Sequence, residues 1–134
     1  SSMDTLPRWL QYGDQVTLPA RAPLYAPGEA VGERPIFYVV AGMVRLEYLF
    51  SGTRVPLYLM PDSVFGLVEV LAECPRHCRA LATERTILYR WDGEGVFTAA
   101  GVSWELALNA TTCLTRELRI LNAEFADRAG DGAA

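Results

Sequence analysis

The residues best suited to chemistry gather in one stretch, FGLVEVLAECPRHCRALA, at positions 65–82. It holds the only histidine of the chain, His77, between Cys74 and Cys78. Imidazole and thiolate groups bind metal ions and can act as bases or nucleophiles. Arg76 precedes the histidine and offers a guanidinium group that pairs well with phosphate or carboxylate. The stretch therefore raises three hypotheses: a metal or haem site, a catalytic dyad, and a pocket for an anionic small molecule.

The metal hypothesis lacks ligands in the sequence. A structural zinc site needs four ligands, and the third cysteine, Cys113, lies in a distant predicted helix. There is no CxxC pair, so the sequence predicts no mononuclear metal site. A haem needs only one axial protein ligand, and His77 is the first candidate for it.

Catalysis by a cysteine–histidine dyad is not favoured either. The segment 77–83 is predicted to be a strand, and neighbouring residues of a strand point to opposite faces. His77 and Cys78 should therefore diverge, and no acid is evidently placed to orient the histidine. The sequence predicts no enzyme.

An anion pocket is the remaining hypothesis. Gly66 permits close approach of the backbone to a ligand, and the helical turn predicted after it exposes free N–H groups. Arg76 follows ten residues later. The turn and the arginine could close on one anion.

Composition bounds the class of protein. The 134 residues carry a net charge of −4 and are 51% hydrophobic, which suits one compact domain. No apolar run approaches the roughly 18–20 residues that span a bilayer, and the start lacks a signal-peptide pattern. Ser1 and Ser2 precede Met3 and are interpreted as the remnant of a tag. The odd number of cysteines favours a reducing cytoplasm. The acidic balance argues against binding of DNA or a membrane by this chain alone.

Most of the chain before Trp91 is predicted to be β-structure. Turns are expected at 26–30, 51–54 and 61–66, and one helical turn at 67–73, ended by Pro75. The predicted strands are 15–20, 24–26, 36–50 with a hinge at Gly42, 55–60, 77–83 and 86–91. Many short strands at near-regular spacing indicate a sandwich or closed roll.

A long helix is predicted from about residue 104 to 127, capped by Ser103 and preceded by a short helix at 92–100. Its apolar residues alternate at spacings of four and three, the seam of a coiled coil. The seam residues are Ala107, Thr111, Leu114, Leu118, Leu121 and Phe125. A second apolar face comprises Leu106, Ala110, Cys113 and Ile120. With two apolar faces, one can cover the roll and the other can form a homodimer.

The predicted organisation has four parts: a lead-in (1–14), a β-roll (15–102), a dimerisation helix (103–128) and a tail or linker (129–134). Within it, four motifs occur in a particular order. They are APGE (26–29), FYVVAGMVRLE (37–47), FSGTR (50–54) and PDSVFGLVEVLAECPRHC (61–78).

In this order and spacing, the run from about Thr17 to about Phe125 resembles the effector domain of the CRP/FNR family of bacterial transcription regulators. The resemblance implies a double-stranded β-helix, a jelly-roll-like β-roll of the cyclic-nucleotide-binding type, followed by a dimerisation helix. Residues 61–78 then correspond to the phosphate-binding cassette. The ligand would contact Gly66, Leu67, Arg76, His77 and Cys78, together with Leu121 and Asn122 of the helix.

The cassette departs from the family pattern at several positions. Leu67 stands where cyclic-nucleotide binders have a glutamate that holds the ribose, and Glu69 should face another way. Asp62 replaces a glycine and adds negative charge, while His77 and Cys78 replace small residues. An unpaired ribose hydroxyl costs on the order of 1–3 kcal/mol. The effector thus remains open between cAMP or cGMP, another small molecule and, through His77, haem; a non-binding dimerisation module is the further alternative. Specific DNA binding is expected of a missing helix-turn-helix domain, not of this chain.

Overall fold

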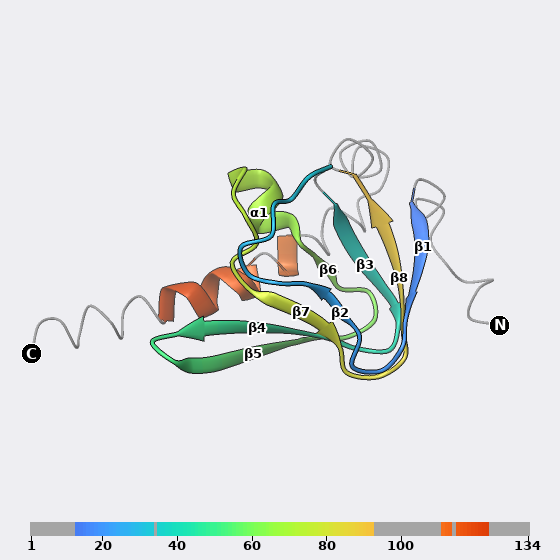
Figure 1. The fold of residues 1–134 in the computed structure, drawn as a ribbon, viewed down its shortest axis with the longest axis horizontal. Coiled ribbons are helices and arrows are strands. Elements are labelled where there is room, and N and C mark those ends of the chain that lie inside the picture. The colour runs from blue at the N-terminus through green and yellow to red at the C-terminus, as the bar shows by residue number, and fades with distance from the viewer. Residues whose placement is uncertain (1–12, 34, 93–110, 114, 124–134) are drawn as a thin grey trace, which may run out of the picture.

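The computed structural model describes residues 13–33, 35–92, 111–113 and 115–123 (Figure 1). Eight strands and one short helix have assigned bounds in these ranges, and residues 111–113 and 115–123 are also helical. The strands are β1 (Asp14–Leu18), β2 (Pro23–Tyr25), β3 (Ile36–Ala41), β4 (Val44–Phe50), β5 (Thr53–Leu59), β6 (Val64–Phe65), β7 (Arg79–Ala82) and β8 (Thr86–Trp91). The helix α1 (Leu67–Ala72) lies between β6 and β7.

The strands form two four-stranded antiparallel sheets. One has the order β1-β8-β3-β6 and the other β2-β7-β4-β5. Chain neighbours often lie in different sheets, as in a jelly roll, and α1 sits at one end of the roll (Figure 1). The predicted mainly β jelly-roll fold is confirmed. No helix in the described ranges combines the length and apolarity needed to cross a membrane.

Two predicted turns have the backbone that their sequence demands. Gly42 joins β3 to β4 with φ of 90°, and a Cβ there would lie 2.5 Å from the carbonyl oxygen of Arg85. Ser51 and Gly52 join β4 to β5, both with positive φ. Positive φ at both central residues suits a tight hairpin between twisted strands. The hinge and the hairpin are therefore confirmed.

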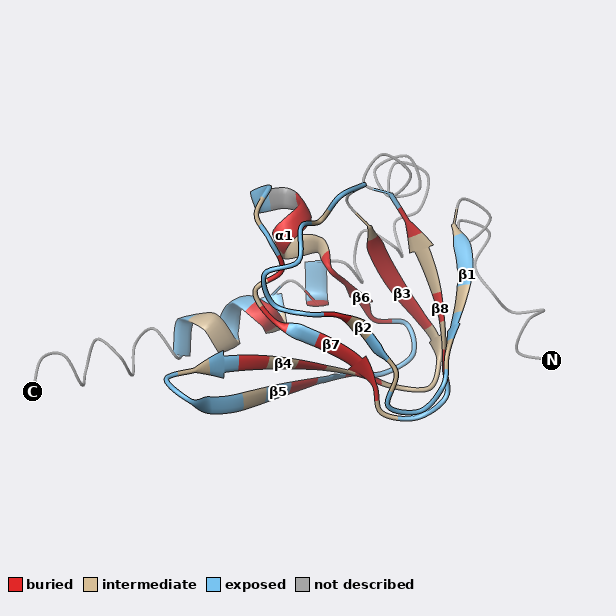
Figure 2. Ribbon diagram, in the orientation of Figure 1, coloured by how far each residue is buried: buried red, intermediate tan, exposed pale blue. Residues whose placement is uncertain are grey.

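The core lies between the two sheets, where inward-facing residues alternate along β4 with more exposed ones (Figure 2). Ile120 and Leu121 of the helix pack against this core. A second, smaller cluster surrounds Trp91 on the other face of β3 and includes Val70 of α1. The helix α1 therefore packs against this second cluster through Val70 and Leu67.

Two boundaries differ from the sequence prediction. Residues 64 and 65, expected in a turn, form β6 and pair with Phe37 and Tyr38. The strand predicted at 77–83 begins only at Arg79, because residues 75–78 run irregularly before β7. Several predictions fall outside the described residues: the 92–100 helix beyond Asp92, the Ser103 cap, Leu106, Ala107, Ala110, Leu114, Phe125 and the tail.

Candidate functional site

Arg76 is buried, and its guanidinium group makes hydrogen bonds within the chain. The side chain is 3% exposed. Nη1 donates to the carbonyl oxygen of Gly66 and to Oε1 of Glu69, both at 2.8 Å, and Nη2 donates to the carbonyl oxygen of Pro35 at 2.8 Å. The guanidinium carbon also lies 4.4 Å from the ring centroid of Tyr25. The charge predicted to meet an external anion thus meets a carboxylate of the same chain.

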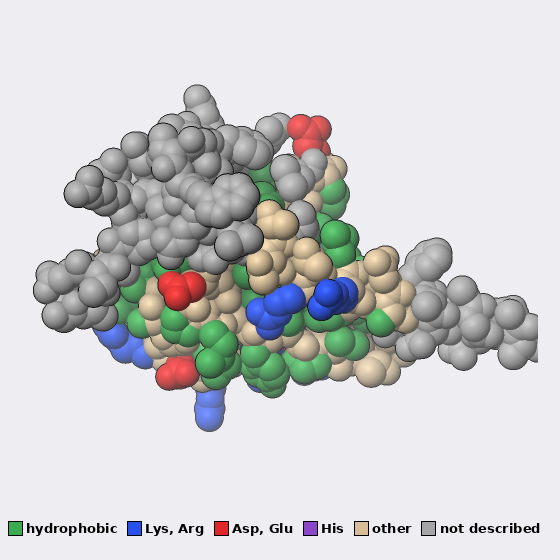
Figure 3. All heavy atoms as spheres, turned by 180° about the vertical axis from the view of Figure 1, so that it is seen from behind, with side chains coloured by type: hydrophobic (Ala, Val, Ile, Leu, Met, Phe, Trp, Pro, Cys, Tyr) green, Lys and Arg blue, Asp and Glu red, His purple; other side chains and the backbone are tan. Residues whose placement is uncertain are grey.

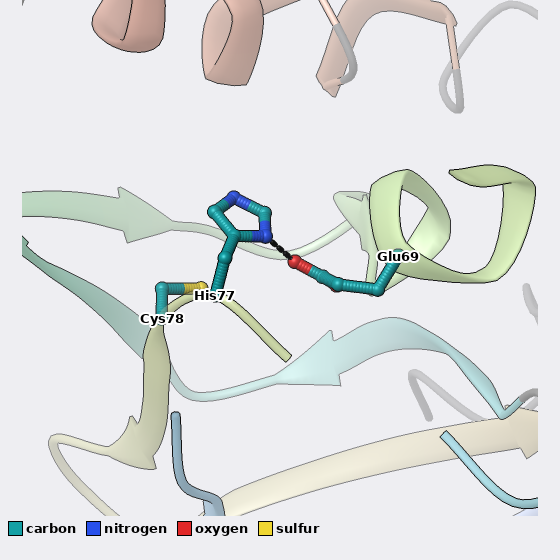
Figure 4. A group of neighbouring side chains, drawn as sticks. All are labelled: Glu69, His77 and Cys78. Atoms are coloured by element: carbon teal, nitrogen blue, oxygen red, sulfur yellow. Dashed lines mark ion pairs between the residues drawn. The ribbon is translucent and has the colours of Figure 1, made fainter. Parts of the chain in front are cut away.

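That carboxylate belongs to Glu69, in the first turn of α1. Glu69 was expected to face another way from Leu67, and it does, because it points to Arg76 whereas Leu67 packs against the second cluster. The side chain of Glu69 is 1% exposed, with Oε1 paired to Arg76 and Oε2 in contact with Nδ1 of His77 (Figure 4). An acid that orients the histidine therefore exists, although none was evident from the sequence.

Cys78 lies beside this pair. One donor atom each of Glu69, His77 and Cys78 falls within 4.8 Å of the others. The sequence analysis expected His77 and Cys78 to diverge as strand neighbours, which was wrong because both precede the first residue of β7. Burial raises the pKa of the Cys78 thiol to about 12, and the carboxylates of Glu69 and Glu117 add to the effect. Without a metal ion, Cys78 is therefore a protonated thiol near neutral pH.

Glu117, on the helix of residues 115–123, extends the cluster to the C-terminal part of the chain. It is 3% exposed, and its Oε2 accepts a hydrogen bond of 3.1 Å from the hydroxyl of Tyr48 on β4. Burial raises the pKa of Glu117 to about 7, and the charge of Glu69 contributes in the same direction. Sequence analysis did not single out this residue, because an isolated glutamate on a helix normally faces water.

Glu69 and His77 each favour the ionised form of the other. Burial acts to raise the pKa of Glu69, but the hydrogen bond and charge of His77, followed by those of Arg76, lower it below its usual value. Burial acts to lower the pKa of His77, but the hydrogen bond and charge of Glu69 raise it. An ionised Glu69 thus sits between two cationic groups, Arg76 and His77.

The other residues that were predicted to contact a ligand lie in different parts of the structure. Gly66 precedes α1 with φ of 85°, and its carbonyl accepts the Arg76 hydrogen bond. Leu67 packs against the second cluster, around Trp91, rather than the roll core. Leu121 packs on the roll core, and Asn122 is exposed. The structure thus brings Gly66, Arg76, His77 and Cys78 together around Glu69, and Leu67 faces elsewhere.

Asp62 adds no free charge to this cluster. It takes φ of 76°, a conformation that favours glycine, and its carboxylate accepts a hydrogen bond from the hydroxyl of Tyr38. Tyr38 belongs to the second cluster. The carboxylate of Asp62 therefore lies against the second cluster, through Tyr38, and not against Arg76.

A haem does not fit the described arrangement of His77. A haem iron needs a ring nitrogen that faces an open cavity. Nδ1 of His77 contacts Glu69, and Nε2 is buried among protein atoms. A pocket of about 240 Å³ adjoins Arg76 and Tyr25, but its lining also comprises Val16, Leu24, Glu29, Ala30, Pro35, Phe37 and Arg90, and not His77.

The sequence profile of the cyclic nucleotide-binding domain matches residues 15–99 of the 134. The chain belongs to this family. The match includes the roll, α1 and the cassette, and with the fold it confirms the predicted resemblance to the effector domains of CRP/FNR-type regulators. A search of curated proteins found no match.

Solved structures of this fold are numerous. The catabolite activator protein of Thermus thermophilus is 25% identical, with a TM-score of 0.71 over 96% of this chain and 59% of its own. FixK2 of Bradyrhizobium japonicum is 24% identical, with a TM-score of 0.60 over 80% of this chain and 52% of its own. The heme domain of CooA from Carboxydothermus hydrogenoformans is 19% identical, with a TM-score of 0.68 over 92% of this chain and 89% of its own. The chain thus spans less than two-thirds of the first two proteins.

Proposed function

We propose that this chain is the effector-sensing domain of a cytoplasmic CRP/FNR-type transcription regulator. It would bind a small effector in the roll and signal through its C-terminal helix to a DNA-binding domain that these residues do not include. The domain itself would perform no catalysis. Family membership and the likeness to the catabolite activator protein support this role.

The link between cassette and helix is the observation that carries the proposal. Glu69 and His77 belong to the cassette, and Glu117, whose pKa responds to both of their charges, reaches Tyr48 from the helix. A ligand that changes the charge or position of Glu69 or His77 therefore changes the packing of the helix on the roll. Two arrangements of the helix would then be the states between which the effector selects.

The effector that suits this cassette is not a cyclic nucleotide. Its phosphate would have to compete with Glu69 and two backbone carbonyls for a buried Arg76. The glutamate expected to hold the ribose is also replaced by Leu67, which faces the second cluster. Both contacts that family members use for the ligand are thus missing or occupied.

Homodimerisation through the C-terminal helix is part of the proposal. Cys113, Glu117, Ile120 and Leu121 are turned toward the roll, whereas Thr111 is exposed and Leu118 is 45% exposed. Arg116 donates to the carbonyl oxygen of Tyr58, so the helix contacts β5 at this residue. The face seen from behind in Figure 3 carries hydrophobic side chains interspersed with arginines. A second copy could cover this face.

A structural dimerisation module that binds no effector is the second candidate. The occupied guanidinium of Arg76 and the aromatic filling of the roll by Tyr25, Phe37, Tyr48 and Phe65 favour it.

Thermal unfolding in the presence of small-molecule candidates separates the two functions, because a ligand of the native state raises the melting temperature by mass action. A sensor is expected to respond to one chemical class and not to cAMP or cGMP. Micromolar binding of cAMP would contradict the proposed effector class, and no response to any class would favour the structural module.

A further inference from the structure

Three different metal-binding groups converge at the cassette. Glu69 contributes a carboxylate oxygen, His77 an imidazole nitrogen and Cys78 a sulfur, all within 4.8 Å of one another. In a tetrahedral zinc site, bond lengths of about 2.0–2.3 Å place neighbouring ligand atoms about 3.3–3.8 Å apart. To surround an ion, the more distant donor atoms would have to approach by about 1 Å, and the direct contact between His77 and Glu69 would have to open so that the ion lies between them.

The groups around these donors would hold them in place. Arg76 fixes Oε1 of Glu69 and leaves Oε2 directed at the cluster. The side chains of Tyr25 and Tyr48 lie beside Cys78. Such contacts to the ligands of a metal site orient them and tune their affinity.

A second buried carboxylate, Glu117, lies near the three donors. Glu69 and Glu117 are both almost fully buried and lie close enough to repel each other. A divalent ion in contact with Glu69 would attract both carboxylates. Glu117 or a water molecule could fill the fourth position.

We propose that Glu69, His77 and Cys78 form a binding site for one divalent transition-metal ion of the zinc type. A mixed oxygen, nitrogen and sulfur donor set suits such an ion better than it suits magnesium or calcium, which prefer oxygen ligands alone. Binding replaces the proton of the Cys78 thiol with a metal–sulfur bond and also removes the proton from the ligating nitrogen of His77, and both protons are released to solvent. No electron transfer is involved.

This site goes beyond the proposed function, since the ion would bind whether or not the domain signals to another domain. The sequence analysis dismissed a mononuclear metal because it counted only cysteines and histidine. Glu69 was expected to face another way, and the irregular course of residues 75–78 was not foreseen.

Cobalt(II) is a direct probe of the site, because thiolate-bound tetrahedral Co²⁺ has a near-ultraviolet charge-transfer band and strong visible bands. Titration of the reduced, metal-free chain with Co²⁺ should give these bands with one ion per chain, and Zn²⁺ should then abolish them. Cys78→Ser should lose the charge-transfer band. Its affinity for Zn²⁺ should fall by more than the about 10–100-fold typical of removing a group that only supports a ligand.

Cys74→Ser is the matched control, because Cys74 is four residues away and is not one of the three converging donors. It should leave the bands unchanged. A band that survives in Cys78→Ser, or disappears in Cys74→Ser, would overturn the proposal. A wild-type chain that takes up no ion would do the same.

A second measurement requires no variant. His77 is the only histidine, so its ring signals in a proton NMR spectrum are unambiguous. Zn²⁺ is expected to shift them and saturate at one ion per chain. Ring signals that stay unchanged at saturating Zn²⁺ would exclude His77 as a ligand and overturn the site, whatever effector the domain senses.

Discussion

At the scale of single residues, the main feature of the site is a carboxylate that occupies the place expected for a ligand. Glu69 pairs with Arg76 inside the cassette, where the family resemblance implied an external phosphate. A buried arginine without an anion would be costly, and an internal anion removes that cost. The charge of Arg76 is therefore already neutralised by Glu69 in the folded chain. Any ligand that needs the Arg76 guanidinium group has to compete with Glu69.

Glu117 gives the clearest pH prediction at this scale. Its folded-state pKa of about 7 exceeds its ordinary value of 4.5, so the native state holds a proton that the unfolded state has lost between these values. The free energy of unfolding should therefore fall as pH rises from about 4.5 to 7, by at most about 3 kcal/mol from this group. Urea unfolding at a series of pH values measures this slope.

Glu117→Gln should flatten the slope in this window, since glutamine keeps a hydrogen-bond acceptor for Tyr48 but does not titrate. The neighbouring titratable groups, Glu69 and His77, change the free energy of unfolding mainly outside this pH window. The lowered pKa of Glu69 affects stability below about pH 4.5, and the raised pKa of His77 affects it above about pH 6.5. Glu84→Gln, at an exposed position, is the control. Equal slopes for the wild type and Glu117→Gln would show that Glu117 titrates as in the unfolded chain.

Gly66 allows a second residue-scale test, because Gly28 has nearly the same backbone conformation in open surroundings. Their φ angles are 85° and 87°. A Cβ at Gly66 would lie 3.2 Å from Nη1 of Arg76 and 3.3 Å from Cδ2 of Phe37, whereas nothing lies within 4 Å at Gly28. Both alanine variants incur the left-handed strain of about 1 kcal/mol.

Gly66→Ala should therefore lose about 1 kcal/mol more free energy of unfolding than Gly28→Ala. Chemical denaturation of both variants gives the comparison. If the two losses are equal, the cassette tolerates the extra methyl group and the close packing around Arg76 is adjustable.

At the scale of elements, the sequence predicts the roll well and its cassette poorly. Hydrophobic alternation and glycine turns locate β1, β2, β3, β4, β5 and β8, because each of these features acts within a few residues. The two-residue strand β6 is too short for any hydrophobic periodicity to be recognised in the sequence. Residues 75–78 follow an irregular course, so a strand rule applied to His77 and Cys78 gave the wrong directions. Contacts across the chain, such as that between Tyr48 and Glu117, leave no local signal at all.

The C-terminal helix carries the prediction of self-association. Leu118 is 45% exposed and lies one residue from Glu117, which is buried on the roll side. Leu118→Glu should weaken the dimer but leave the melting temperature nearly unchanged at concentrations where the wild type is monomeric, because Leu118 contributes little to the protomer core. Sedimentation equilibrium over a range of concentrations measures the association.

Leu49→Glu is the matched control for this variant, since Leu49 is 64% exposed on β4. It should sediment like the wild type. A wild-type chain that stays monomeric at high concentration, or a Leu118→Glu chain that dimerises as strongly as the wild type, would contradict the helix interface.

At the scale of the whole molecule, family membership and local geometry point to different ligands. The fold is that of domains that bind cyclic nucleotides, yet the arginine of its cassette is engaged by Glu69, and Leu67 faces away from the roll. Fold alone does not determine a ligand, because the contacts in the site decide it. The geometry therefore supports the proposal that the effector of this domain is not a cyclic nucleotide.

Glu69→Gln tests whether the internal carboxylate is what excludes a cyclic nucleotide. The substitution keeps the shape of the side chain but removes the charge that neutralises Arg76. A phosphate can then provide the missing charge, so cAMP should raise the melting temperature of Glu69→Gln and not that of the wild type. Adenosine, which lacks the phosphate, should affect neither, and Glu73→Gln should behave like the wild type. If cAMP stabilised neither protein, the leucine that replaces the ribose-binding glutamate at position 67 would be the decisive departure. If cAMP stabilised both equally, the pair of Glu69 and Arg76 would be no barrier to phosphate.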